Sequence, residues 1–178
     1  IMDIALNSSG RYLAVAQLLS DGDQASSRIQ FIDLHQKKVI QTADRANTVI
    51  GELRFSGGKL LSVSDAELCG FSDSGRLLYT VSFAGKKPSK YDISSDELLA
   101  FVTSDNRGNA VLELYGTNGK RKGQYYADSS VGSLAVCGDM VAFARQRDLI
   151  YVNQWGKLKK KVSSAHDVKN LGIFGDAR

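Results

Sequence analysis

Proline is nearly absent from this chain, in which Pro88 is the one proline against seventeen glycines in 178 residues. So little proline argues against extended, proline-rich linkers, and so much glycine favours tight turns that need a positive φ. Long apolar runs are missing as well. No stretch approaches the roughly 18 uncharged residues that a membrane-spanning helix requires, so these residues predict no transmembrane segment.

Cysteine and histidine are scarce, with two of each. Cys69 and Cys137 each lie in an apolar strand pattern, without the paired spacing of a zinc site or a disulfide framework, and are predicted to be buried thiols. His35 and His166 have no acidic residue or cysteine at ligand spacing, whereas zinc and copper sites need three or four converging ligands. We therefore expect no resident metal and no cofactor.

Catalytic signatures are missing too, beginning with the G-x-S-x-G motif that presents a serine nucleophile. Residues 116–123 resemble a phosphate-cradling loop, but their glycine spacing is two short of the Walker pattern and no helix pattern follows. Residues 20–24 and 72–76 place carboxylates near glycine without the ligand ladder of a calcium loop, and Asp96 and Glu97 fall in a predicted turn. We predict that the chain is not an enzyme and has no catalytic, cofactor-binding or metal-ligating residue.

What the sequence does contain is a repeat with a period of about forty residues. The composition, 43% hydrophobic with a net charge of +4, is that of a globular chain. In each copy an apolar strand meets a tight polar turn, β-branched and aromatic residues fill the apolar positions, and no apolar stripe has helical spacing. The copies are residues 4–16, 53–64, 91–103, 134–144 and, truncated, 171–178.

This pattern predicts an all-β chain folded as a β-propeller of four-stranded antiparallel blades. The expected blades are residues 1–46, 47–85, 86–128 and 129–165, followed by the first strand of a fifth at 166–178. The unfinished copy and the first residue, Ile1, predict a partial propeller from a circle of roughly seven or eight blades. We expect a homodimer or blades outside this segment to complete it. A pair of β-sandwiches is the alternative fold.

Two loops are predicted to be longer than the others, residues 20–27 and 104–109, and long loops are where propellers place binding contacts. Asn118 and Gly119 predict a type I′ hairpin turn.

Parts of the sequence resemble known propeller repeats. Residues 8–15, SSGRYLAV, are similar to the inner hairpin S-P-D-G-K-Y-L-A-V of WD40-like bacterial propellers. Residues 68–81 and 138–158 are more similar to PQQ-like blades, and the lone tryptophan, Trp155, lies in a turn rather than in a Trp-Asp pair. As a whole the chain resembles bacterial PQQ-like propeller proteins of unknown function that are tethered to the membrane by a segment before the propeller.

The resemblance implies an extracytoplasmic parent protein that is anchored in the membrane through a segment outside this chain. A cytoplasmic location is the alternative. For function we predict a non-catalytic binding or scaffold propeller that engages a protein or cell-envelope ligand through residues that the sequence does not identify. The alternative is part of a quinone-dependent dehydrogenase-like propeller enzyme, whose metal and cofactor ligands would come from other blades.

Positive charge is unevenly distributed, with ten Lys or Arg against five Asp or Glu in residues 105–165. Residues 120–122 and 157–161 fall at the start of the outermost strand of two successive predicted blades. Such a patch suits acidic lipid headgroups, an anionic wall polymer or nucleic acid. The alternative is that lysines on an edge strand discourage aggregation. Tyr125, Tyr126 and Tyr151 fit strand alternation rather than a base-stacking platform, so specific nucleic-acid binding is not expected.

Overall fold

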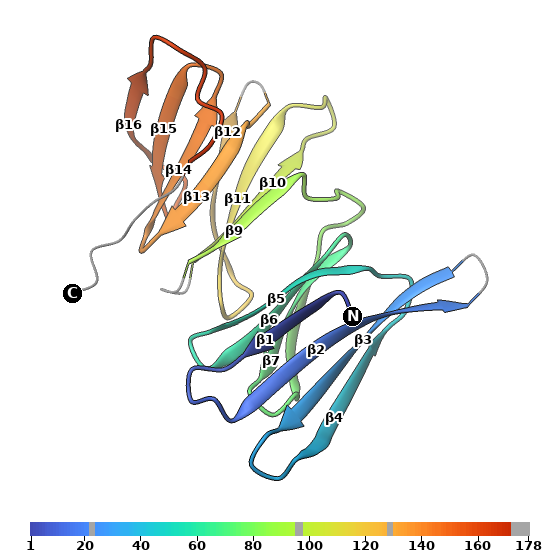
Figure 1. The fold of residues 1–178 in the computed structure, drawn as a ribbon. Coiled ribbons are helices and arrows are strands. Elements are labelled where there is room, and N and C mark those ends of the chain that lie inside the picture. Colours follow the sequence, from blue (N-terminus) through green and yellow to red (C-terminus); the bar gives the residue numbers. More distant parts are fainter. Residues whose placement is uncertain (22–23, 95–97, 128–129, 172–178) are drawn as a thin grey trace. The chain divides into compact units, whose positions relative to one another are not determined.

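The computed structural model describes residues 1–21, 24–94, 98–127 and 130–171, and in these residues it contains strands and turns but no helix (Figure 1). Sixteen strands form four antiparallel sheets of four strands, each in sequence order. We call the sheets blades 1 to 4 in chain order. The all-β prediction is confirmed. The described part of the chain therefore contains no helix that could span a membrane.

The chain divides into two compact units, and unit 1 spans Ile1–Lys87. It holds blades 1 and 2. Their strands are β1 (Asp3–Leu6), β2 (Tyr12–Asp21), β3 (Gln24–Asp33) and β4 (Lys38–Arg45), then β5 (Ile50–Ser56), β6 (Lys59–Ser64), β7 (Glu67–Ser72) and β8 (Leu77–Ser82).

Unit 2 spans Pro88–Arg178 and holds blades 3 and 4. Its strands are β9 (Lys90–Ile93), β10 (Leu98–Ser104), β11 (Ala110–Gly116) and β12 (Arg121–Ala127), then β13 (Ser133–Cys137), β14 (Met140–Arg145), β15 (Asp148–Asn153) and β16 (Leu158–Ser163).

Each unit buries an apolar core between the facing sides of its two blades. In unit 1, Ile29 and Phe31 of β3 alternate with more exposed residues and pack with Leu60 and Phe71 of blade 2. In unit 2 the corresponding core contains Phe143 together with residues of both blades. Because side chains alternate between the two faces of a strand, each period-two apolar pattern supplies one wall of such a core.

Polar side chains link the blades at their inner strands. Asp3 of β1 accepts the backbone N–H of Leu53 in β5 at 2.6 Å, and Asp92 of β9 accepts that of Val136 in β13 at 2.7 Å. An edge strand presents unpaired N–H groups, and a carboxylate from the preceding blade satisfies one of them in each unit. The same device in both units shows that blades 1 and 3 are equivalent copies.

A β-bulge recurs in all four blades, where the third and fourth strands pair. The register shifts between Phe31 and Ile32, between Gly70 and Phe71, between Leu114 and Tyr115, and between Tyr151 and Val152. Each shift leaves one extra residue on the outermost strand, close to the hairpin turn. A bulge bends its strand and increases the local twist, so the outer edge of every blade curves in the same way.

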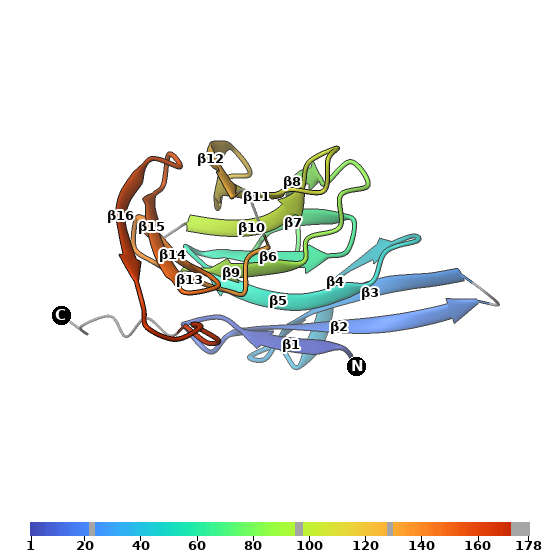
Figure 2. The same ribbon diagram turned by 90° about the horizontal axis from the view of Figure 1, so that it is seen from above.

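The predicted loop at residues 20–27 is wrong. The β2–β3 ladder continues through the Ser20–Ala25 and Asp21–Gln24 pairs, so this polar stretch is a long hairpin (Figure 2). The polar composition concealed these strand ends, because the two strands pair through backbone hydrogen bonds that do not depend on the type of side chain. The turn itself, residues 22–23, lies outside the described residues.

The predicted type I′ turn at Asn118–Gly119 is also wrong. Only Gly119 has a positive φ, 75°, and its N–H donates to the Gly116 carbonyl. A type I′ turn needs a positive φ at both central residues. The turn is instead a longer loop that ends in a left-handed glycine, and Asp105–Asn109 closes in the same way around Gly108. Residues 105–109 separate β10 from β11, whereas residues 65–66 and 146–147 fill the corresponding place in blades 2 and 4, so the longer loop predicted at 104–109 is confirmed.

The strand expected to open a fifth blade does not begin in the residues that the structure describes. Residues 164–171 contain no strand, and residues 172–178 lie outside the described part. Residues 164–168 run beside blade 4, where the N–H groups of Ser164 and Val168 donate to the carbonyls of Arg147 and Gln146. A first inner strand needs a second strand as its partner, so the fifth blade stays a prediction.

Candidate functional site

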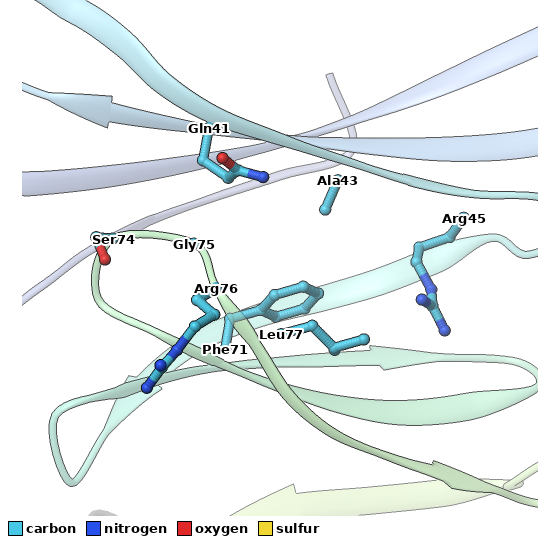
Figure 3. Close-up of a pocket in the computed structure, with 8 residues that line it drawn as sticks. All are labelled: Gln41, Ala43, Arg45, Phe71, Ser74, Gly75, Arg76 and Leu77. Carbon is cyan, nitrogen blue, oxygen red and sulfur yellow. The ribbon is translucent and has the colours of Figure 1, made fainter.

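A hollow of about 520 Å³ lies in unit 1 between blades 1 and 2 (Figure 3). One wall is β4, and the other is β7 together with the β7–β8 turn and the start of β8. The residues that line it are Gln41, Ala43, Arg45, Phe71, Ser74, Gly75, Arg76 and Leu77. We call this feature the hollow.

Local sequence explains how the hollow forms. Gln41, Ala43 and Arg45 are spaced two apart on β4, so they share one face of that strand. The other wall comes close through Gly75, where an added Cβ would lie 2.6 Å from the Phe31 ring. Phe71 is buried at the base, with its ring centroid 5.4 Å from that of Phe31. The hollow therefore has a rigid aromatic base under a polar opening.

The two guanidinium groups of the hollow differ in their surroundings. Arg45 is held by Glu67 of β7, with its Nε 2.7 Å from Glu67 Oε1 and a second contact from Nη2 to the same oxygen. Arg76 is exposed and makes no ion pair with any residue that the structure describes. The exposed guanidinium is the charge that a ligand would meet first.

Cys69 lies beside this ion pair, 3.5 Å from Glu67 Oε1. Burial raises the pKa of its thiol to about 11, and burial also raises the pKa of Tyr79 to about 12. A thiol with such a pKa stays protonated near neutral pH and is a poor nucleophile. The prediction of a buried thiol is confirmed for Cys69, whereas Cys137 is only half-buried.

The residues weighed for chemistry in the sequence belong to different turns and strands. His35 is exposed in the β3–β4 turn, and His166 is exposed beyond β16. Residues 116–123 form the β11–β12 turn and the start of β12. Asp96 and Glu97, like residues 22–23 of the weighed calcium loop, fall outside the described residues. Across the described ranges, no three His, Cys, Asp or Glu side chains gather to hold a metal.

The lysines and arginines of residues 120–122 and 157–161 lie where the sequence places them, in the outermost hairpins of the neighbouring blades 3 and 4. The hollow was missed because Arg76 was considered only as part of a calcium loop. The Gly75-Arg76 pair that follows the turn was the available signal, since Gly119-Lys120 and Gly156-Lys157 occupy the same place in blades 3 and 4.

The sequence matches the model of a protein family described as "Family of unknown function (DUF5711)" over residues 1–177. No curated protein matches it.

Several solved structures share the fold. BamB from Moraxella catarrhalis is 15% identical with a TM-score of 0.57, over 98% of this chain and 54% of BamB. The designed protein Ika8 is 12% identical with a TM-score of 0.62, over 97% of this chain and 66% of Ika8. A chain of the mitotic checkpoint complex is 14% identical with a TM-score of 0.61, over 94% of this chain and 52% of that one.

These likenesses confirm the β-propeller fold with four-stranded blades. At such identities they show the fold alone. This chain spans about half the length of BamB and of the checkpoint protein.

Proposed function

This chain belongs to the family of unknown function DUF5711, and we propose that it is a non-catalytic binding or scaffold propeller for a protein or cell-envelope ligand. The observation that carries the proposal is the hollow. It joins a buried aromatic base, Phe71, to an exposed guanidinium, Arg76, and an exposed amide, Gln41. An apolar base beside an exposed arginine suits a protein-binding hot spot, in which arginine is enriched.

The charge of the hollow indicates the chemistry of its ligand. Both ionisable side chains that line it are arginines, and one of them, Arg76, has no acidic partner among the described residues. A carboxylate accepts two parallel hydrogen bonds from a guanidinium. We therefore propose a protein segment that presents an Asp or Glu side chain next to an apolar one.

Arg76→Glu is expected to weaken binding of a fluorescein-labelled Glu- and Phe-rich peptide roughly tenfold or more, because it places like charges together. Fluorescence anisotropy measures this, with a Lys- and Phe-rich peptide as the matched probe. Arg107→Glu, which makes the same charge change at an exposed turn of unit 2, is the control variant. Equal affinity for both peptides, or an unchanged affinity in Arg76→Glu, would contradict the proposal.

The outer face of blade 1 supports a second part of the proposal. Ile4 and Leu6 of β1 are 53% and 54% exposed, whereas Ala5 between them is buried against blade 2. Val39, on β4, is 48% exposed. Apolar side chains in a row on a sheet face indicate a packing partner. We propose that in the isolated 178-residue chain this face packs against a second copy.

Replacing both Ile4 and Leu6 with glutamate is expected to shift the 178-residue chain from dimer to monomer, since charges in an apolar interface oppose association. Sedimentation velocity measures the change. Leu34→Glu and Leu78→Glu, at exposed positions of the β3–β4 turn and of β8, form the control pair. A monomeric wild-type chain would contradict self-association. We would then expect further blades of the parent protein to cover this face.

An extracytoplasmic, membrane-anchored parent protein remains a proposal that rests on the resemblance of the repeats. The quinone-dependent alternative has its own test. Stoichiometric uptake of calcium and pyrroloquinoline quinone by the full-length protein would favour it over a scaffold role.

A further inference from the structure

The outermost hairpins of blades 3 and 4 carry positively charged side chains and no negatively charged ones. Residues 116–127 and 153–163 contain seven lysines or arginines and no aspartate or glutamate. All seven side chains are exposed. We call this set the basic rim; its members are Lys120, Arg121, Lys122, Lys157, Lys159, Lys160 and Lys161.

The two hairpins form one continuous surface. Lys122 of β12 donates from Nζ to Gln154 Oε1 in the β15–β16 turn at 2.7 Å. The backbones also meet, because a Cβ added to Gly123 would lie 2.2 Å from the carbonyl carbon of Trp155. The basic residues of blade 3 therefore adjoin those of blade 4 within unit 2.

Acidic neighbours neutralise only part of this charge. Glu113 pairs with Arg121 at 3.5 Å, and Asp148 pairs with Lys161 at 2.9 Å. The hydrogen bond from Lys161 lowers the pKa of Asp148. The remaining five lysines make no ion pair with any residue in the described ranges. Lysines on an edge strand protect that strand from pairing with another chain, but Lys120 and Lys157 lie in the turns before β12 and β16, so edge protection does not account for the whole excess.

Exposed apolar side chains lie within the basic rim. Trp155 is 63% exposed in the turn between Lys122 and Lys157, and Leu158 and Val162 on β16 are 47% and 41% exposed. Tryptophan is favoured where an apolar layer meets water, and lysine stems lie along apolar surface while their ammonium groups stay in water. Aliphatic side chains favour a lipid boundary over nucleic acid, whose bases stack on aromatic rings.

We propose that the basic rim docks onto an anionic lipid surface, with its lysines among the headgroups and Trp155 at the boundary of the acyl chains. This surface lies in unit 2 and is independent of the hollow in unit 1, so the failure of one proposal leaves the other intact. Attraction between a polybasic surface and anionic lipid is weakened by salt.

The chain contains its own reporter, since Trp155 is its only tryptophan. With phosphatidylcholine vesicles that contain phosphatidylglycerol, we expect a blue shift of Trp155 emission and quenching by lipids brominated on the acyl chains. Phosphatidylcholine alone should produce neither effect, and added salt should reverse both. Because Trp155 is the one tryptophan, emission excited at a wavelength that tyrosine does not absorb comes from the proposed surface itself.

A triple variant, Lys157→Gln, Lys159→Gln and Lys160→Gln, should bind these anionic vesicles roughly a hundredfold more weakly, because each cation at such a surface contributes about fivefold. The control, Lys37→Gln with Lys86→Gln and Lys87→Gln, removes the same charge from exposed positions in unit 1. Thermal unfolding verifies that both variants fold. Equal loss in the two variants would overturn the proposal, as would a Trp155 shift with a single-stranded oligonucleotide but not with vesicles.

Discussion

Gly156→Ala is expected to lower the stability of unit 2 by about 3 kcal/mol or more, because the new methyl group has no room and the backbone has an unsuitable φ. Gly156 has a φ of 77°, and a Cβ there would lie 2.0 Å from the backbone oxygen of Gln124 in blade 3. A backbone atom cannot move aside as a flexible side chain can. The two blades would have to separate.

Two further glycines distinguish the effect of the clash from that of the φ. Gly123→Ala introduces a clash alone, 2.2 Å from Trp155, whereas Gly138 has a φ of 57° but open space around it. Urea unfolding followed by Trp155 fluorescence should rank the losses as Gly156→Ala, then Gly123→Ala, then Gly138→Ala at about 1 kcal/mol. If Gly123→Ala lowers the free energy of unfolding no more than Gly138→Ala does, then close contact between the blades is not the reason that glycine is needed at positions 123 and 156.

The strands were predictable because they depend on local sequence. In β10 (Leu98–Ser104) the residues from Leu98 to Val102 are apolar and turn residues follow the strand, so its type and its start follow from composition. The extension of β2 and β3 into polar residues was not predictable, since Ser20 and Ala25 pair through backbone hydrogen bonds that no apolar pattern marks. The bulges were not predicted for the same reason. In a bulge two residues of one strand oppose one residue of the other, and this depends on register rather than on residue type.

The hollow could not be predicted from one sequence. Gln41 and Arg76 belong to different blades and meet only after both sheets have formed and packed. The hairpin glycines were visible in the sequence, but the contact of Gly75 with Phe31 was not. In contrast, the basic rim was largely predictable, because equivalent positions of successive repeats lie side by side in neighbouring blades. Repeats thus predict surfaces formed by equivalent positions better than they predict sites formed by different ones.

Phe31→Ala is expected to destabilise unit 1 by about 3 to 5 kcal/mol, the usual range when a buried phenylalanine is truncated. Phe31 is fully buried, packs against Phe71 at 5.4 Å between ring centroids, and fills the space beside Gly75. Its loss removes contacts on both sides of the seam between blades 1 and 2. Because a domain has only about 5 to 15 kcal/mol of stability, this one change would remove a large part of it.

The same substitution tests whether the hollow depends on that seam. Phe31→Ala should lower the urea midpoint of unit 1 and weaken binding of the Glu- and Phe-rich peptide together, since Phe31 supports the Phe71 base of the hollow. Leu34→Ala, which truncates an apolar residue that is 38% exposed in the same blade, should change the free energy of unfolding by less than about 0.5 kcal/mol. If the two variants unfold at the same urea concentration, the aromatic pair is not the main contact between blades 1 and 2. If Phe31→Ala unfolds early but the folded fraction binds the peptide with unchanged affinity, the hollow is maintained by its other wall residues.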